Sequence, residues 1–512
     1  MSNGVVPPVG CIGPARLTAG FEDFGRLDLW AHLEVHGDLR PLSADDLIDL
    51  AEKIKLTGRG GAGFPFHRKV KAVVESADRQ DRAPVIVVNA TEGEPPSWKD
   101  KMLLTRAPHL ILDGAALAAW ALEAEEIVIG VADDGVGQSS LEEALAERRM
   151  PAPTRIVTVP HRFIAGEGGA LVRGINGEAH IPPGIKQRSS ESGVNGQPTL
   201  LSNAETYSQI AVAARLGPED YTSVGTKKEP GTVLLTIGGS AAQHMVLECP
   251  TGVPLREVLD ICGATEGPGI LVGGYHGKWI TWENAQKAEV SRESFAAIGG
   301  TLGAGMIIPL GNDTCPLGEA SRIVRYLAGE SAGQCGPCRL GLPDVANQFQ
   351  LLTASGSAAA EQAVRNAAGM VRGRGACSHP DGTSRFALTA LEVFAEDIKR
   401  HRLGEGCGKP VKKLLPIPNE LPGGPNIGKL KLDWARCDGH GLCAEVFPEL
   451  IKLDGNGYPA FPDAPVPIWL EAAAKKAILV CPALALHLDK GGNERGGSAD
   501  RGGKPKPAPR RR

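Results

Sequence analysis

Short apolar runs rich in β-branched residues punctuate the first third of the chain. They read VIVV at residues 85–88, IVIGVA at 127–132 and IVTV at 156–159. Alanine-rich stretches of helical character separate them, at residues 110–125 and 139–147. Strands that alternate with helices form a mostly parallel sheet with helices on both faces, so an α/β domain is expected here.

The pattern changes twice further along the chain. Residues 229–312 carry strand-like runs around one short helix, and residues 317–402 carry apolar residues at helical spacing. Residues 415–426 are rich in proline and predict a stiff, extended linker. The chain is therefore expected to contain a Rossmann-like α/β domain (1–228), an α+β module (229–312), a helical bundle (313–408), a linker (409–427), a small α+β domain (428–490) and a disordered tail (491–512).

Composition and charge exclude some classes of function. The net charge of −4 gives no electrostatic reason to expect a nucleic-acid partner. The most apolar stretch, residues 110–132, contains four acidic residues, so no direct membrane insertion is expected. The N-terminus lacks the basic and apolar regions of a signal peptide. We therefore expect a cytoplasmic protein, either free or peripheral to a membrane complex.

Six of the eleven cysteines fall into two patterned groups. In a cytoplasmic chain such groups favour metal or cluster ligands over disulfides. The groups are Cys335, Cys338 and Cys377, and then Cys437, Cys443 and Cys481; the remaining Cys11, Cys249, Cys262, Cys315 and Cys407 show no ligand spacing and are expected to be mostly small buried residues.

The second group resembles the ligand set of a small ferredoxin. Cys437 and Cys443 are six residues apart, and the distant Cys481 is followed by proline. Such a cluster carries single electrons. The long region before it is therefore expected to supply or accept them.

A glycine-rich loop, Gly58-Arg-Gly-Gly-Ala-Gly-Phe64-Pro65, precedes Lys69. Its glycines allow backbone N–H groups to approach a phosphate or a flat ring, and Arg59 and Lys69 add positive charge. A tight turn without a ligand is the alternative.

The run at residues 85–88 ends in Asn89-Ala-Thr-Glu92-Gly-Glu94. Open parallel sheets bind ligands at the carboxyl ends of their strands. Amide and carboxylate groups there can hydrogen-bond the edge of an isoalloxazine ring or the hydroxyls of a sugar. A solvated acidic turn is the alternative.

Several motifs in order resemble the flavin-bearing, NADH-oxidising subunit of respiratory complex I and its relatives in soluble NAD-linked hydrogenases and formate dehydrogenases. The motifs are Arg59–Pro65, Val88–Pro96, Gly166–Gly168, the Ser331–Cys338 segment and Cys377. Their order and approximate spacing match over residues 50–400, about two thirds of the chain. The region 428–490 is similar to single-cluster ferredoxins that serve monooxygenases.

The resemblance implies an FMN-binding domain, a ubiquitin-like β-grasp module, a helical iron–sulfur bundle and a C-terminal ferredoxin domain. It implies Glu94 and Lys69 as catalytic residues. It also implies a cofactor site formed by Gly58, Arg59, Gly60, Gly61, Phe64, Lys69, Asn89, Glu92, Gly166, Glu167, Ser202 and Asn203, and metal ligation by Cys335, Cys338, Cys377, Cys437, Cys443 and Cys481.

Some positions depart from the family pattern around the nicotinamide. Thr91 replaces an acidic residue, and Gly168 replaces a glutamate that lies near the nicotinamide. Ala72 and Arg188 stand where the family has aromatic rings that hold the adenine. The substrate is therefore left open between NADH, NADPH, which the basic Arg173, Lys186 and Arg188 would favour, and neither.

The two cysteine groups also depart from their families. Ala332 takes the place of one cysteine, so Cys335, Cys338 and Cys377 are expected to hold a [3Fe-4S] cluster or a [4Fe-4S] cluster with another fourth ligand. Zinc with His379 as a ligand, or buried thiols without metal, are the alternatives. In the ferredoxin region His440 replaces a cysteine, which favours [3Fe-4S].

The function expected from these features is an NAD(P)H dehydrogenase-like oxidoreductase that passes electrons through FMN to iron–sulfur clusters. The alternatives are a nicotinamide-independent electron relay and a degenerate structural subunit. The expected partner is a redox protein: a thioredoxin-like ferredoxin subunit, a monooxygenase or a membrane reductase.

Overall fold

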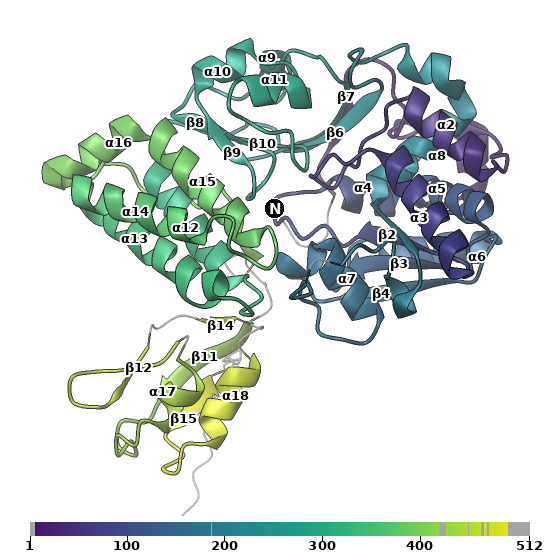
Figure 1. Cartoon of the computed structure of the whole chain (residues 1–512). Helices are drawn as coiled ribbons and strands as arrows, with labels where there is room; N and C mark the ends of the chain where they lie inside the picture. Colours follow the sequence, from purple (N-terminus) through teal and green to yellow (C-terminus); the bar gives the residue numbers. More distant parts are fainter. Residues whose placement is uncertain are drawn as a thin grey trace, which may run out of the picture. The chain divides into compact units, whose positions relative to one another are not determined.

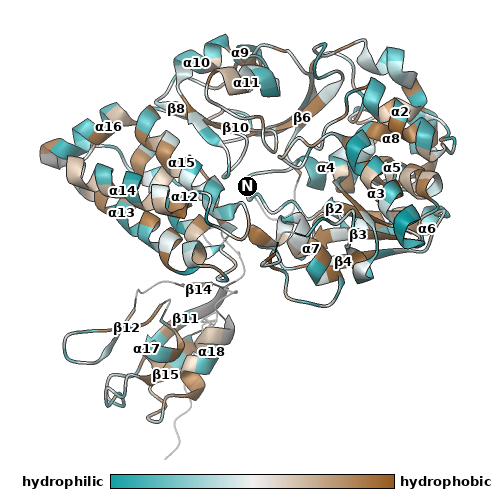
Figure 2. Cartoon of the chain, viewed as in Figure 1, coloured by the Kyte–Doolittle hydropathy of each residue, from teal (hydrophilic) through white to brown (hydrophobic). Residues whose placement is uncertain are grey.

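The computed structural model describes residues 6–185, 187–418, 426–448, 450–461, 465–467 and 471–489. The chain forms two compact units, Met1–Ile417 and Pro418–Arg512. Each unit has hydrophobic cores of its own (Figures 1 and 2). The predicted tail and most of the predicted linker's C-terminal half, residues 419–425, lie outside the described residues.

The first unit begins with a four-stranded parallel sheet in the order β4-β3-β2-β5. Its strands are β2 (Val85–Ala90), β3 (Glu126–Ala132), β4 (Thr154–Val159) and β5 (Thr199–Asn203). The three apolar runs predicted as strands are β2, β3 and β4, whereas the sequence pattern does not predict β5. The mixed α/β class with a parallel sheet is confirmed, in agreement with a Rossmann-like domain.

Helices cover this sheet on both faces. They are α1 (Leu29–His36), α2 (Ala44–Lys53), α3 (Phe66–Gln80), α4 (Lys99–Arg106), α5 (Pro108–Leu122), α6 (Gln138–Glu147), α7 (Gly168–Ile175) and α8 (Ala204–Thr222), with 3₁₀ turns at Ile164–Gly166 and Val194–Gly196. α5 and α8 pack very closely at Gly114, where a Cβ would lie 2.0 Å from the carbonyl oxygen of Tyr207. Glycine is required at that crossing because any side chain would push the helices apart.

A second sheet has six strands in the order β1-β7-β6-β10-β8-β9. They are β1 (Val9–Cys11), β6 (Thr232–Ile237), β7 (Met245–Pro250), β8 (Gly269–Val272), β9 (Lys278–Ile280) and β10 (Met306–Leu310), accompanied by α9 (Leu255–Ile261), α10 (Trp282–Lys287) and α11 (Arg292–Ala297). Three short helices are present where the pattern predicts one.

The start of the chain joins this second sheet. Val9 pairs in parallel with Val246, and the buried carboxylate of Glu248 accepts hydrogen bonds from the backbone N–H groups of Leu17 and Thr18. The sequence pattern places residues 9–11 in the first domain because three residues carry no recognisable strand pattern. The structure corrects that assignment.

The remainder of the first unit is a bundle of helices. They are α12 (Pro316–Gly329), α13 (Leu342–Ser355), α14 (Ala358–Val371), α15 (His379–Val393) and α16 (Ala395–Arg400), with π-helical turns at Pro337–Gly341 and His401–Glu405. The chain then returns along α12: Pro410 accepts a hydrogen bond from Cys315 N, and Leu415 and Ile417 are buried. Residues 410–417 are thus packed rather than part of a free linker, because they supply apolar anchors.

The second unit is small. It contains a three-stranded antiparallel sheet in the order β14-β11-β15, a two-stranded hairpin and two helices. The elements are β11 (Asn426–Leu432), α17 (Leu442–Val446), β12 (Lys452–Leu453), β13 (Pro459–Ala460), β14 (Pro465–Pro467), α18 (Glu471–Leu479) and β15 (Leu486–Asp489). Within the described parts of both units, we find no helix that is long and apolar enough to cross a membrane.

Candidate functional site

The glycine-rich loop connects α2 to α3 and lies against the carboxyl end of β5. Gly61 and Gly63 have positive φ angles of 113° and 64°, which L side chains rarely adopt. The backbone N–H of Arg59 donates to Thr206 Oγ1 at 2.9 Å, which fixes the loop to α8. A Cβ at Gly60 would lie 3.3 Å from Asn203 Cβ. The fold therefore brings the predicted loop and the predicted Asn203 together.

The end of β2 meets a second loop. Asn89 Nδ2 donates to the carbonyl oxygen of Gly166 at 2.9 Å, and Asn89 Oδ1 accepts from the Thr91 hydroxyl at 2.7 Å. A Cβ at Gly166 would lie 3.2 Å from Gly93 N, so the two loops approach closely. Glu167 accepts a hydrogen bond from Ala170 N and caps α7. Asn89, Gly166 and Glu167 are thus neighbours, and their polar groups organise the backbone at this end of the sheet.

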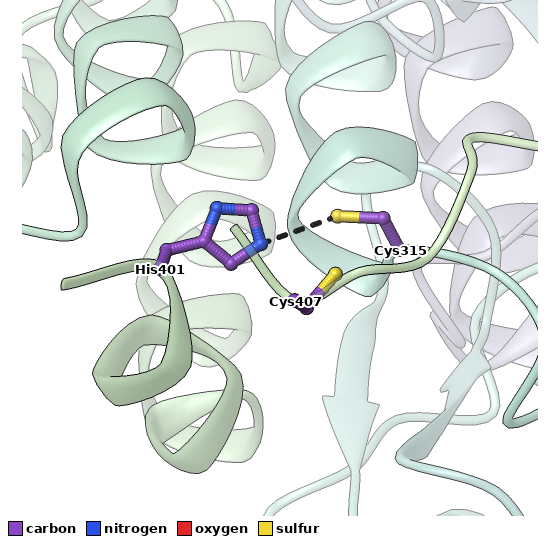
Figure 3. Close-up of side chains that lie close together, drawn as sticks. All are labelled: Cys315, His401 and Cys407. Atoms are coloured by element: carbon purple, nitrogen blue, oxygen red, sulfur yellow. Dashed lines mark hydrogen bonds between the residues drawn. The ribbon is translucent and has the colours of Figure 1, made fainter. Parts of the chain in front are cut away.

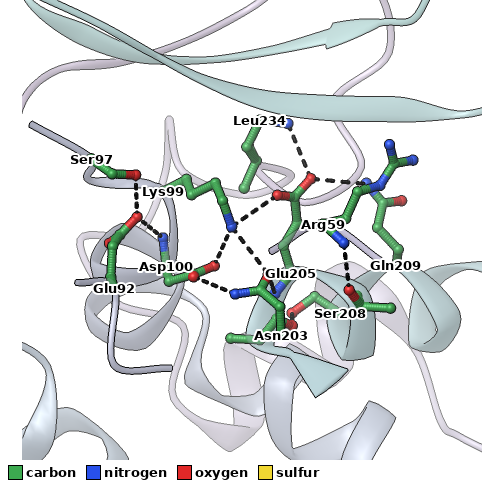
Figure 4. Close-up of polar contacts among 12 residues, drawn as sticks. Arg59, Glu92, Ser97, Lys99, Asp100, Asn203, Glu205, Ser208, Gln209 and Leu234 are labelled. Atoms are coloured by element: carbon green, nitrogen blue, oxygen red, sulfur yellow. Dashed lines mark hydrogen bonds and ion pairs between the residues drawn. The ribbon is translucent and has the colours of Figure 1, made fainter. Parts of the chain in front are cut away.

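A buried ion network lies beside these loops (Figure 4). Lys99 Nζ is 2.7 Å from Asp100 Oδ1, 3.2 Å from Glu205 Oε2 and 3.1 Å from Asn203 Oδ1. Burial lowers the pKa of Lys99, but Asp100, Glu205 and Glu92 outweigh burial and raise the pKa above its ordinary value. Lys99 is therefore a fixed positive charge.

Glu92 has a structural task in this network. Its carboxylate accepts from the backbone N–H groups of Asp100 and Lys101 at the start of α4, and from the Ser97 hydroxyl at 2.5 Å. Burial and the nearby Asp100 raise its pKa, and Lys99 opposes that shift. The carboxylate predicted to contact a cofactor therefore holds the first turn of α4 in place.

Glu94 stands two residues further on and touches the second sheet region. Its Oε2 accepts a hydrogen bond from Tyr275 N at 2.9 Å. Burial raises the pKa of Glu94 to about 7, although hydrogen bonds from the backbone of Tyr275 and His276 lower it. This carboxyl can change its protonation state near neutral pH, as expected for a group that handles protons.

The cradle has an unsatisfied polar group that fits a flavin phosphate or ring. Ser202 Oγ is buried and has no hydrogen-bond partner among the described residues. A buried polar atom of this kind calls for a ligand or water. The Arg59 guanidinium, in contrast, lies 4.0 Å from Glu205 Oε1 and donates to the carbonyl oxygen of Thr232 at 3.3 Å. Lys69 Nζ donates to the carbonyl of Leu201, directly before Ser202, and burial lowers the pKa of this lysine. The donors and the open glycine backbone together suit FMN.

Three thiols meet at the start of the helical bundle. Cys335 lies just before the π-helical turn that contains Cys338, and Cys377 lies just before α15. Burial raises the pKa of Cys335, but the backbone N–H groups of Ala376 and Cys338 and the Cys338 thiol lower it below its ordinary value. Burial and the nearby Cys335 raise the pKa of Cys338 to about 11. The three thiols interact, and N–H donors that favour a thiolate face Cys335.

His379 does not complete this set. Its Nε2 lies 2.7 Å from the carbonyl oxygen of Leu327, and its Nδ1 lies 3.0 Å from His276 Nε2. Both ring nitrogens are therefore occupied. The ligand atoms of a zinc site lie within about 4 Å of one another. The sulfur atoms of Cys335, Cys338 and Cys377 are farther apart, because these three do not form a group with all ligand atoms within 4.8 Å. The geometry favours a cluster over zinc.

One segment joins the flavin cradle to the thiols of the bundle. Phe163 N donates to Glu330 Oε2 at 2.7 Å, and the Phe163 ring packs 5.7 Å from His379. Three residues later, Gly166 is held by Asn89. Glu167 lies close enough to Cys377 to help raise the pKa of that thiol, after burial. The two sites predicted from separate motifs are thus direct neighbours.

Of the residues expected around a nicotinamide, one is exposed to a ligand and two are paired with acidic side chains. The Phe64 ring is 48% exposed and free to stack on a ligand. Arg173 pairs with Glu178 at 2.7 Å, and Arg188 lies 3.6 Å from Glu191, so both basic side chains have acidic partners. Lys186 lies outside the described residues.

In the second unit, Cys437, Cys443 and Cys481 line one pocket together with His440. Gly439 and Gly441 have positive φ angles on either side of His440, which lets the loop curl around the pocket. Cys481 Sγ accepts from Ala485 N at 3.4 Å. The loop and the distant cysteine therefore meet as a cluster site requires.

Sequence reasoning missed Lys99, Asp100 and Glu205. Two sequence features could have indicated this ion network. They are the charged run from Lys99 to Lys101, shortly after the acidic end of β2, and a glutamate two residues after Asn203. It also missed a group made by Cys315 and two distant residues, because Cys315 shows no ligand spacing along the chain.

Three family models match the chain. They are the Nuo51 FMN-binding domain over residues 51–212, the NADH-ubiquinone oxidoreductase-F iron–sulfur binding region over 318–401, and a 4Fe-4S single cluster domain over 430–488. By fold and site, the chain is a flavin-binding protein with iron–sulfur regions.

Region by region, the chain is thus similar to the flavin-bearing F-type subunits of NADH-quinone oxidoreductases, and its C-terminal side is similar to a single-cluster domain. It is 26% identical to an F-type NADH-quinone oxidoreductase subunit of Rhizobium meliloti over 70% of this chain and 89% of the relative. It is 27% identical to the corresponding NADH-quinone oxidoreductase subunit of Streptomyces coelicolor over 74% of this chain and 89% of the relative.

Two further similarities extend beyond complex I. The NADP-reducing hydrogenase subunit HndC of Solidesulfovibrio fructosivorans is 24% identical over 85% of this chain and 90% of that protein. The crystal structure of an air-oxidised NAD⁺-reducing [NiFe]-hydrogenase shares the fold, with a TM-score of 0.67 and 23% identity over 78% of this chain and 68% of that one.

Proposed function

We propose that this protein is a flavo-iron–sulfur oxidoreductase that passes electrons from NAD(P)H through FMN to iron–sulfur clusters and an external acceptor. The observation that carries the proposal is the segment from Phe163 to Glu167, which is bonded to Glu330 of the bundle at one end and to Asn89 at the carboxyl end of β2 at the other. FMN suits this position because a flavin accepts two electrons together and releases them singly.

The proposed roles follow the contacts. Gly58, Gly60 and Gly61 leave room for the flavin, and Ser202 offers it an unpartnered hydroxyl. Arg59 adds positive charge beside the loop while its guanidinium pairs with Glu205. The fixed charge of Lys99 orients Asn203.

The proposed role of Glu94 is proton handling. With a pKa of about 7, its carboxyl holds or releases a proton at physiological pH beside the cradle. The hydrogen bond from Tyr275 N fixes the direction of that carboxyl.

The thiol groups are assigned to electron transfer. One cluster is proposed to be held in the bundle by Cys335, Cys338 and Cys377. A second is proposed to be held in the ferredoxin-like unit by Cys437, Cys443 and Cys481.

The six-stranded sheet with its helices is proposed to be the β-grasp module.

A redox protein is the proposed partner. The relatives are named as subunits of quinone oxidoreductases and of a hydrogenase, which supports a partner that exchanges electrons. A thioredoxin-like ferredoxin subunit, a monooxygenase and a membrane reductase remain the candidates, and a cytoplasmic location remains a prediction.

Anaerobic mixing of the purified protein with NADH or NADPH tests the proposal. Flavin absorbance is expected to bleach, followed by reduced-cluster signals in low-temperature EPR. A Cys335→Ser variant is the matched control: bleaching is expected to persist while the bundle cluster signal disappears. If neither nucleotide bleaches the flavin, the nicotinamide part of the proposal fails.

A second function, a nicotinamide-independent electron relay, is favoured by specific contacts. Arg173 and Arg188 have acidic partners, and Gly168 lacks the family's carboxylate. In that case a reduced redox protein would bleach the flavin although both nucleotides fail. A colourless protein after reconstitution with FMN, iron and sulfide would instead indicate a structural subunit.

A further inference from the structure

Cys315, His401 and Cys407 form a cluster that is separate from the thiols at 335, 338 and 377 (Figure 3). Their ligand atoms all lie within 4.8 Å of one another, the only such group found among the described residues. Cys315 is 4% exposed, His401 is 6% exposed and Cys407 is half-buried. Two thiols and an imidazole meet here from two stretches of chain, the start of α12 and residues 401–407.

The imidazole of His401 is oriented by a carbonyl group. His401 Nδ1 lies 2.6 Å from the carbonyl oxygen of Thr353. A carbonyl only accepts hydrogen bonds, so Nδ1 carries the hydrogen and Nε2 keeps a free lone pair. That lone pair faces Cys315 Sγ at 3.5 Å. A histidine held by a backbone carbonyl on one nitrogen and open on the other is typical of a metal ligand.

The spacing suits a single small ion. With Zn–S and Zn–N bonds of about 2.3 and 2.0 Å, a tetrahedral site places sulfur and nitrogen ligands about 3.5 Å apart. The observed distance from Cys315 Sγ to His401 Nε2 is 3.5 Å. The backbone N–H of Gly318 at the start of α12 also donates to Cys315 Sγ at 3.3 Å, so a hydrogen-bond donor already faces this sulfur.

We propose that Cys315, His401 and Cys407 bind one zinc ion, with a water molecule in the fourth position. Two thiolates and an imidazole are ligands that zinc prefers. Binding replaces the protons of the two thiols, which are released to solvent. This site is separate from the flavin and cluster sites and does not depend on the proposed function.

The ion would fasten the end of the bundle. Cys315 is the N-cap of α12, His401 follows α16, and Cys407 begins the segment that returns along α12. That segment is already held by hydrogen bonds from Cys315 N to Pro410 and from Leu414 N to Glu319. Zinc would add a covalent-like link between these three parts immediately before the chain enters the second unit.

Metal analysis of the full-length protein tests the site. Purified wild-type protein is expected to contain about one zinc per chain in addition to its iron, with sulfur at about 2.3 Å and nitrogen in X-ray absorption at the zinc edge. Cys407→Ser and His401→Gln should each lower zinc content at least about tenfold. FMN and iron content should remain unchanged.

A control variant and a measurement of folding keep the test decisive. Cys262→Ser, a buried cysteine at the end of α9, should retain full zinc content. Circular dichroism spectra of Cys407→Ser and His401→Gln should match wild type, which separates loss of zinc from loss of folding.

Several results would overturn the proposal. Wild-type protein supplied with zinc could contain less than about a tenth of an equivalent of zinc, or could hold iron or copper at this site instead. Both Cys407→Ser and His401→Gln could keep the wild-type zinc content. Peptide mass maps of the purified protein could show a Cys315–Cys407 disulfide.

Discussion

Replacing Glu94 by glutamine should change how the stability of the first unit depends on pH. The Glu94 carboxyl is largely shielded from water, and its folded-state pKa of about 7 lies above the value of 4.5 for an unshifted glutamate. The folded protein therefore binds this proton more tightly than the unfolded chain does between those two values. The wild-type free energy of unfolding should fall as pH rises from 4.5 to 7 and remain low above pH 7.

The size of the effect follows from the same two values. A difference of about 2.5 pKa units corresponds to about 3 kcal/mol, which is an upper limit because the side chain retains some contact with solvent. Glutamine cannot ionise, yet its carbonyl oxygen can still accept the hydrogen bond from Tyr275 N. Glu94→Gln should thus match wild type near pH 5 and exceed its stability by up to about 3 kcal/mol at pH 8.

Thermal melts of both proteins at pH 5, 6, 7 and 8 measure this difference. Comparing the proteins at each pH removes the pH dependence of all other groups. Glu142→Gln, which changes an exposed residue of α6, is the matched control and should show no pH-dependent difference. A gap between Glu94→Gln and wild type that stays constant from pH 5 to pH 8 would refute the assigned pKa shift.

Three further predictions concern charge and cluster ligands. Lys99→Met leaves Asp100 buried without its cation and leaves Glu205 with Arg59 alone, 4.0 Å away, so it should cost about 3–5 kcal/mol and reduce bound FMN. Chemical unfolding and flavin content measure this, and an unchanged midpoint would contradict it. Ala332→Cys should supply a fourth thiolate and convert a three-iron to a four-iron EPR signal in the bundle; an identical spectrum and iron count would count against a cluster there. His440→Cys should likewise convert a three-iron to a four-iron cluster in the second unit, and the iron count and EPR spectrum of that cluster measure the change. Loss of all iron would show instead that the loop cannot accept the substitution.

Much of the first unit could be predicted because its core strands are buried on both faces. β2 and β3 are apolar throughout most of their length, a pattern that few other structures produce. The edge strand β4 was recognisable from its β-branched run IVTV, although most of it is only partly buried or exposed. β5 was missed because its sequence, TLLSN, is short and ends in polar residues. β1 was missed because its partner β7 lies far along the chain, and three residues carry no period of their own.

The candidate site was predictable where chemistry is local. The glycine loop and the acidic strand end were recognisable, since each fits within ten residues. The sequence does not reveal that the carboxylate of Glu92, predicted to contact a cofactor, also meets the first turn of α4. Cys315 and His401 are 86 residues apart, so no spacing rule brings them together before the fold is known.

The pairing of β1 with β7 has a consequence for how the protein is made. Val9 stays without its neighbour until Val246 has left the ribosome, so the edge of the second sheet closes late during translation. A fragment that starts after Cys11 would expose the backbone of β7 as an open edge and invite aggregation. Expression trials of shortened versions should therefore keep the first strand.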